Sequence, residues 1–118
     1  MGKENIIQTK SYAFSLRVIK LFIYLKDEKK EFILSKQLLR SATSIGANVE
    51  EAIGGQSKKD FISKLAIAYK ESRETHYWLR LLKDAGFLKE DLALSFIEDC
   101  EELIKILTSI INSTKSNS

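Results

Sequence analysis

Proline is absent from this chain of 118 residues, and glycine occurs only five times. Without these residues, the usual interruptions of helices are rare, so long helices are possible. One cysteine excludes an intramolecular disulfide, and one histidine leaves few ligands for a structural zinc ion. A chain of this length buries about two-thirds of its unfolded surface, so a hydrophobic core alone can stabilise one domain.

Features of secreted and membrane-spanning proteins are also missing. No basic and apolar signal segment is found at the N-terminus, and no apolar run reaches about 18 residues. We therefore expect a cytoplasmic protein that makes no membrane contact. The net charge of +3 permits binding to nucleic acid without requiring it.

Apolar residues recur at steps of three and four, which is the periodicity of helices and not of strands. Four such segments predict an all-α chain with helices over about residues 11–27, 32–53, 58–85 and 89–111. Short connections make neighbouring helices antiparallel, so residues 1–118 are expected to form one antiparallel up-down-up-down four-helix bundle. Residues 112–118 have nothing to bury and are expected to be a disordered tail.

Small residues mark the expected helix ends and contacts. Gly54 or Gly55 is expected to form a left-handed C-cap after the second helix. Ser57, followed by Asp60 three residues later, resembles a capping box at the start of the third helix. Gly46 would let a neighbouring helix approach the second helix closely.

More apolar surface is present than one bundle can easily bury. The first helix has an inner stripe with further apolar residues beside it: Tyr12, Leu16, Ile19 and Ile23. The third helix carries Ile67, Trp78 and Leu81 away from its main seam. Part of this surface is therefore expected to contact other subunits.

Two segments in the second and third helices have a more specific sequence pattern than a four-helix bundle alone requires. Residues 37–52 (QLLRSATSIGANVEEA) resemble the helix-two signature of the four-helix-bundle proteins encoded in 23S ribosomal RNA intervening sequences, and residues 71–79 (ESRETHYWL) are similar to that family's third helix. The resemblance implies a bundle without known enzymatic activity that assembles as a ring, commonly a homopentamer. The family is also similar to the accessory protein of diversity-generating retroelements, a basic pentameric barrel that binds nucleic acid and a reverse transcriptase.

Polar residues in step with this signature form a set of seven: Arg40, Ser41, Ser44, Asn48, Glu51, Glu71 and Glu74. In a hairpin of antiparallel helices centred on Gly55, residue numbers at one height sum to about 110, which predicts a salt bridge between Arg40 and Glu71. We favour a structural role for these residues over a binding site, and both roles remain open. A buried Arg40 predicts that Arg40→Ala costs ~1 to 3 kcal/mol through an unpaired partner.

No constellation typical of catalysis or metal binding is found. A di-iron bundle needs Glu-x-x-His on two helices, whereas Arg73 stands three residues before His76, the single histidine. Cys100 lies on the apolar stripe of the fourth helix, which predicts a buried, inert thiol. We therefore predict a non-enzymatic protein with no catalytic residues, no metal and no cofactor.

Charge is concentrated on the third helix. Residues 57–87 contain seven basic and four acidic residues, and residues 88–118 contain three basic and six acidic ones. At about 100° per residue, six basic residues of the third helix fall within an arc of roughly 140°. This basic arc consists of Lys58, Lys59, Lys70, Arg73, Arg80 and Lys83. Tyr69, His76 and Tyr77 lie within it, and such interleaving is typical of surfaces that bind single-stranded or looped RNA.

Two functions follow from these patterns. The first is a homo-oligomer, expected to be a pentamer, that binds structured RNA or another nucleic acid through the basic arc. The second is an oligomeric protein-interaction scaffold with no specific nucleic-acid role, with a reverse transcriptase as one possible partner. Charge reversal within the arc separates them, because only the first predicts loss of RNA binding with an intact ring. The substituted residues would be Lys58, Lys59, Arg73 and Arg80.

Overall fold

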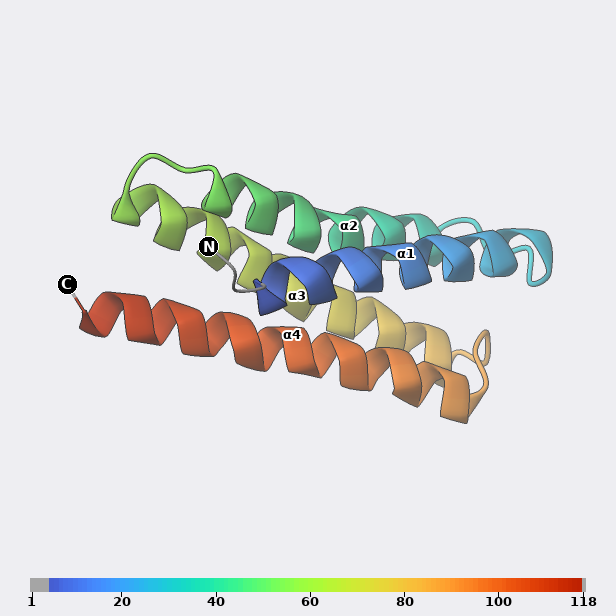
Figure 1. The fold of residues 1–118 in the computed structure, drawn as a ribbon. Coiled ribbons are helices and arrows are strands. Elements are labelled where there is room, and N and C mark those ends of the chain that lie inside the picture. The colour runs from blue at the N-terminus through green and yellow to red at the C-terminus, as the bar shows by residue number, and fades with distance from the viewer. Residues whose placement is uncertain (1–4, 118) are drawn as a thin grey trace.

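Four helices, each antiparallel to the next, make up the computed structural model, which describes residues 5–117 (Figure 1). Their bounds are Ile6–Asp27 for α1, Leu34–Ile53 for α2, Lys58–Asp84 for α3 and Glu90–Ser116 for α4. The predicted all-α four-helix bundle is confirmed. Residues 1–4 and 118 of the predicted domain lie outside the described part.

The helices do not pack equally against one another. α2 contacts α3 most extensively, α3 then contacts α4, and α1 contacts α2, whereas α1 and α4 meet over a short stretch. Each helix contributes buried apolar residues to one shared core. α3 therefore has a neighbour on two sides and an exposed face on the third.

Helix α1 begins earlier than the predicted start at residue 11. The side-chain oxygen of Asn5 accepts a hydrogen bond from the backbone nitrogen of Gln8 at 3.1 Å, which caps the helix. Ile7 is buried in the core, so the first turn is also anchored by packing. Ser11 lies inside the helix, where its hydroxyl donates to the carbonyl oxygen of Gln8.

The prediction of a disordered tail is wrong for the described residues, because α4 continues through Ser116. The hydroxyl of Thr114 donates to the carbonyl oxygen of Ile110 at 2.7 Å, within the extended helix. Ile111 is half-buried, and Lys115 in the last turn complements the negative end of the helix dipole. The added residues 112–116 therefore follow a half-buried position and have a side-chain hydrogen bond and a favourable charge to stabilise them.

Among the described glycines, only Gly86 has a left-handed backbone, with φ at 88° just after α3. The left-handed cap predicted at Gly54 or Gly55 is wrong, because Gly54 has φ at −83° and donates its N–H to the carbonyl oxygen of Glu50. Glycine at position 55 avoids a tight contact, since an added Cβ would lie 3.2 Å from the carbonyl oxygen of Ala52.

Two other local predictions agree with the structure. The hydroxyl of Ser57 accepts a hydrogen bond from the backbone nitrogen of Asp60 at 3.1 Å, which caps α3. An added Cβ at Gly46 would lie 3.4 Å from the Ser15 hydroxyl and 3.5 Å from the Ser11 carbonyl oxygen. These are ordinary van der Waals distances, so α1 and α2 approach each other here as predicted, and an alanine would also fit.

Glu31 caps α2 from outside the helix, a role that the sequence analysis missed. Its buried carboxylate accepts hydrogen bonds from the backbone nitrogens of Ile33, Leu34 and Ser35 at 3.2, 3.0 and 2.7 Å. Burial raises the pKa of Glu31, but these hydrogen bonds together outweigh it and leave the pKa below the usual value of 4.5.

We expect Glu31→Gln to destabilise the bundle by about 1 to 2 kcal/mol at neutral pH, because the amide loses the charge-assisted bonds. A carboxyl with a lowered folded pKa stabilises the protein above its unfolded pKa and loses this effect as pH falls through the folded value. The difference between the variant and the wild type should therefore shrink below pH 4.5. Urea unfolding across pH measures it, with exposed Glu28→Gln as the control.

Candidate nucleic-acid interface

The predicted ion pair between α2 and α3 is present and belongs to a larger network. Arg40 Nη1 lies 3.3 Å from Glu71 Oε1, and Arg40 Nη2 contacts Glu74 Oε2. The indole nitrogen of Trp78 donates to the same Glu74 oxygen at 2.9 Å. Hydrogen bonds from Arg40 and then Trp78 hold the pKa of Glu74 below its usual range. The network thus fixes the position of the Trp78 ring.

The other polar signature residues also bond within the bundle. Inside the core, the hydroxyl of Thr75 donates to the hydroxyl of Ser41 at 2.9 Å. Ser44 donates to a backbone carbonyl of its own helix, as does the amide of Asn48. Glu51 pairs with Lys64 of α3 at 2.8 Å. These contacts support the structural role.

Arg40 itself is not buried, since its side chain is 49% exposed. Solvent screening weakens exposed ion pairs, so we expect Arg40→Ala to cost about 1 kcal/mol, the low end of the range predicted for a buried arginine. Urea unfolding of this variant tests the value, with exposed Lys36→Ala on the same helix as the control. A loss of about 3 kcal/mol or more would contradict the screened interaction.

The basic arc of α3 divides into two groups. Exposed cations that form no ion pair among residues 5–117 are Lys59, Lys70, Arg73 and Arg80. The other two have partners: Lys83 pairs with its sequence neighbour Asp84 at 2.8 Å, and Lys58 Nζ donates to the carbonyl oxygen of Asn117 at 3.1 Å. Four of the six predicted cations are thus exposed and form no ion pair within the described part of the chain.

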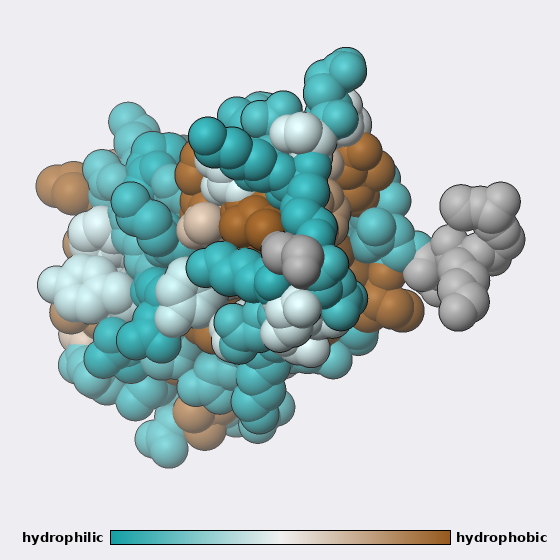
Figure 2. All heavy atoms as spheres, turned by 90° about the vertical axis from the view of Figure 1, so that its left-hand side faces the viewer, coloured by the Kyte–Doolittle hydropathy of each residue, from teal (hydrophilic) through white to brown (hydrophobic). Residues whose placement is uncertain are grey.

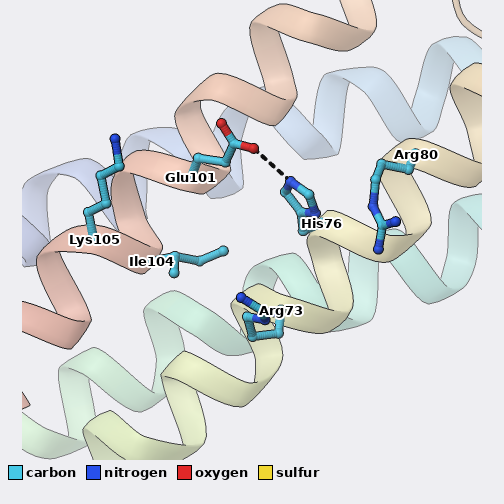
Figure 3. A pocket seen from close by; sticks show the side chains of 6 residues that line it. All are labelled: Arg73, His76, Arg80, Glu101, Ile104 and Lys105. Atoms are coloured by element: carbon cyan, nitrogen blue, oxygen red, sulfur yellow. Dashed lines mark hydrogen bonds and ion pairs between the residues drawn. The ribbon is translucent and has the colours of Figure 1, made fainter.

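Beside this face, α3 and α4 enclose a hollow of about 580 Å³. Its lining residues are Arg73, His76 and Arg80 from α3 and Glu101, Ile104 and Lys105 from α4 (Figure 3). Figure 3 shows Glu101 pointing toward His76, with an arginine on each side of the histidine along α3. The lining has three cationic side chains and one carboxylate, so its net charge is positive even when His76 is counted as uncharged.

Three of the six acidic residues of α4 form ion pairs with other helices in the described part of the chain. Glu101 Oε2 lies 2.9 Å from Nε2 of His76, and Glu102 lies 3.3 Å from Lys10 of α1. Asp99 pairs with Arg17, whose guanidinium also stacks over a core phenylalanine. The paired carboxylates of α4 therefore contact His76 and α1, and among residues 5–117 none of them pairs with the two arginines of the hollow.

Aromatic rings border the arginines. The Tyr77 ring is 46% exposed, meets Trp78 edge-on with centroids 5.1 Å apart, and lies 5.8 Å from the Arg80 guanidinium carbon. Farther along the same pair of helices, Tyr69 and Lys115 line a second hollow of about 250 Å³. Cations and aromatic rings thus alternate along the α3–α4 side of the bundle.

The α4 residues of the larger hollow were missed in the sequence analysis, which considered α3 alone. The register rule centred on Gly86 would not have found them. It gives a sum of about 172 for residues at one height, which places Phe96 opposite His76, whereas the observed pair of His76 and Glu101 sums to 177.

A second surface of interest lies on α1. Apolar residues spaced by four, three and four positions form an exposed α1 stripe: Tyr12, Leu16, Ile19 and Ile23. This stripe is the outer half of the wide apolar surface predicted for the first helix. On α3, Ile67 and Tyr77 are exposed, whereas Trp78 packs against the core, so the larger unpartnered apolar surface belongs to α1. The end of the bundle shown in Figure 2 is instead mostly hydrophilic, with small separate apolar patches.

Metal and thiol chemistry receive no support in the described part. Residues 5–117 contain no group of three or more histidine, cysteine, aspartate or glutamate side chains that could hold a metal ion. Burial, followed by the charges of Glu101 and Asp99, raises the pKa of Cys100 to about 12. The thiol is buried as predicted and stays protonated at neutral pH.

No helix among residues 5–117 has both the length and the apolar character needed to span a bilayer.

Fold and surfaces together define a small four-helix-bundle protein with a basic face and an apolar stripe. The sequence pattern of the 23S rRNA-intervening sequence proteins matches residues 3–109, so the chain belongs to that family, as the resemblance indicated.

A solved structure supports both the fold and the family. It is the crystal structure of a protein of unknown function from the S23 ribosomal protein family of Bacteroides thetaiotaomicron. The two chains are 47% identical with a TM-score of 0.90, and the similarity covers 92% of this chain and 96% of the other. No curated protein sequence matches this chain.

Proposed function

We propose that this chain is a non-enzymatic RNA-binding protein of the cytoplasm, and that it binds through the exposed cations of α3 and the hollow beside them. The observation that carries the proposal is the pair Arg73 and Arg80, which flank the hollow without an ion-pair partner among residues 5–117. Guanidinium groups bind phosphate oxygens through a planar fork of donors. The family's name, which refers to 23S rRNA, favours RNA as the polyanion.

Self-assembly would make this modest site effective. The α1 stripe has the spacing of a helix seam that packs against another helix, and a second copy of the chain is the partner we propose for it. A closed ring, of five subunits as the family resemblance implies, repeats the arginine pair in every subunit. Affinity for a polyanion rises with the number of phosphates neutralised, so weak sites combine into a strong one.

A protein-interaction scaffold is the second candidate function. The α1 stripe favours it, since exposed apolar surfaces of this kind mark protein interfaces. In that case, the ring and its protein partner use the apolar surface, and the cations of α3 serve only solubility.

A titration of the wild-type protein against fluorescently labelled RNA, repeated across salt concentrations, tests the proposal. We expect binding that weakens steeply with salt, with a log–log slope of about −0.7 for each phosphate neutralised on a single strand. Duplex DNA serves as the competitor. Absence of binding at low salt, where screening is weakest, would contradict RNA binding and favour the scaffold.

A further inference from the structure

Tyr77 is the most exposed aromatic ring on the basic face of α3. The side chain lies inside a long helix, away from both of its ends, where an aromatic ring usually packs against a neighbour. Its polar surroundings are cationic, with the Arg80 guanidinium carbon 5.8 Å from the ring centroid. An exposed ring beside a cation is suited to contact another flat, electron-rich group.

The Tyr77 ring is held in place by its neighbour on the same helix, Trp78. Tyr77 meets Trp78 edge-on at 64° with centroids 5.1 Å apart, and the Trp78 indole donates to Glu74, which is paired with Arg40. These contacts connect the Tyr77 ring to α2 through Trp78 and Glu74. A prearranged ring loses little freedom when a ligand stacks on it, which favours binding.

Arg80 connects the ring to the hollow. The same side chain lines the hollow and lies near the Tyr77 ring, and Arg73 lines the hollow one turn before Tyr77. On a helical wheel at about 100° per residue, the two arginines lie between His76 and Tyr77. A phosphate at the arginines would therefore place the attached nucleotide within reach of the ring.

We infer that Tyr77 stacks with an unpaired base of an RNA strand whose phosphate binds between Arg73 and Arg80. The ligand is then a single strand or a loop and not a continuous duplex, because paired bases are stacked on one another and present no free face. This inference rests on the proposed function and deepens it, since charge alone would accept any polyanion.

The test compares two RNAs with the same number of phosphates, a labelled single strand and a blunt duplex, for three proteins. The wild type should bind the single strand at least about 10-fold more tightly than the duplex. Tyr77→Leu should lose about 5- to 150-fold in affinity for the single strand, the range that loss of one aromatic–base stack produces. Tyr77→Phe, which keeps the ring, is the control and should resemble the wild type.

Fluorescence of Trp78, the one tryptophan in the chain, supplies a second measurement. We expect the single strand, at saturation, to quench Trp78 emission in the wild type and in Tyr77→Phe and to quench it much less in Tyr77→Leu. Equal affinity for the two RNAs, or unchanged single-strand affinity of Tyr77→Leu, would overturn the inference and leave the proposed function standing. Failure of the wild type to bind either RNA would overturn both.

Discussion

The double variant Arg73→Glu/Arg80→Glu should lose RNA binding by at least about 100-fold at low salt while keeping the fold and the assembly. Both side chains are exposed and form no ion pair among residues 5–117, so their replacement breaks no internal contact of that kind. Each glutamate replaces attraction to a phosphate by repulsion. RNA binding measured by fluorescence anisotropy reports the loss.

Salt dependence gives this prediction a quantitative form. Two lost phosphate contacts should reduce the log–log salt slope by about 1.4 per subunit, which is 0.7 for each contact on a single strand. Lys29→Glu/Lys36→Glu is the matched control, because it changes the net charge equally at exposed positions away from the basic arc. Equal loss of affinity in the two double variants would mean that net charge, and not the α3 face, determines binding.

Lys58 is better left unchanged in such experiments, although the sequence analysis included it. Its amine donates to the carbonyl oxygen of Asn117, near the end of α4. Substitution at Lys58 would disturb that end of the bundle, and lost binding could then reflect lost structure. The two arginines test the surface without this complication.

The second large effect is expected on α1, where Leu16→Glu/Ile23→Glu should convert the assembly into a 13.5 kDa monomer. Both side chains are exposed in the subunit, so the changes leave the core intact. In an assembly that covers the α1 stripe, each carboxylate would be buried without a partner, which costs several kcal/mol. Light scattering coupled to size-exclusion chromatography measures the mass.

Lys20→Glu is the control for this variant. It lies on the same helix, is exposed, and changes the net charge by the same amount without placing a carboxylate on the stripe. We expect it to assemble as the wild type does. An assembled Leu16→Glu/Ile23→Glu variant would show that the subunits meet elsewhere, and a monomeric wild type would contradict the ring itself.

The register of α2 against α3 was predictable from the sequence because the connection between them is short. The α2–α3 connection at Gly54 to Ser57 fixes the pairing of the two helices, so the summed residue numbers correctly placed Arg40 beside Glu71. Applied to α3 and α4 around Gly86, the same rule gives a sum of about 172 and would have paired His76 with Phe96, whereas the observed partner is Glu101. The longer connection between α3 and α4 therefore leaves their register less well determined by the sequence.

Exposure was harder to predict, because it depends on packing between distant elements. The half-exposed state of Arg40 and the outward half of the apolar surface of α1 both follow from how the four helices meet. Helix periodicity gives the width of an apolar surface and not the side that a neighbour covers. The α1 stripe stays open because it lies on the face of α1 opposite the buried residues of that helix.

The ends of the helices and their capping residues were also hard to predict from the sequence. Asn5 and Glu31 cap helices through side chains next to the helix starts, and α4 continues past the expected end at residue 111. Polar residues at such positions can cap a helix or lie in a loop. Local sequence alone does not decide between these, since the capping depends on the hydrogen bonds that the folded chain offers.

The most direct measurement is identification of the residues that contact RNA. Single-stranded RNA containing thiouridine can be photocross-linked to the wild-type protein and the modified peptides mapped by mass spectrometry. We predict adducts on α3 between Lys70 and Lys83 and on α4 between Glu101 and Lys105, with few on Arg73→Glu/Arg80→Glu. Adducts concentrated on the α1–α2 connection, or adducts unchanged by the arginine substitutions, would contradict RNA binding through the α3–α4 face.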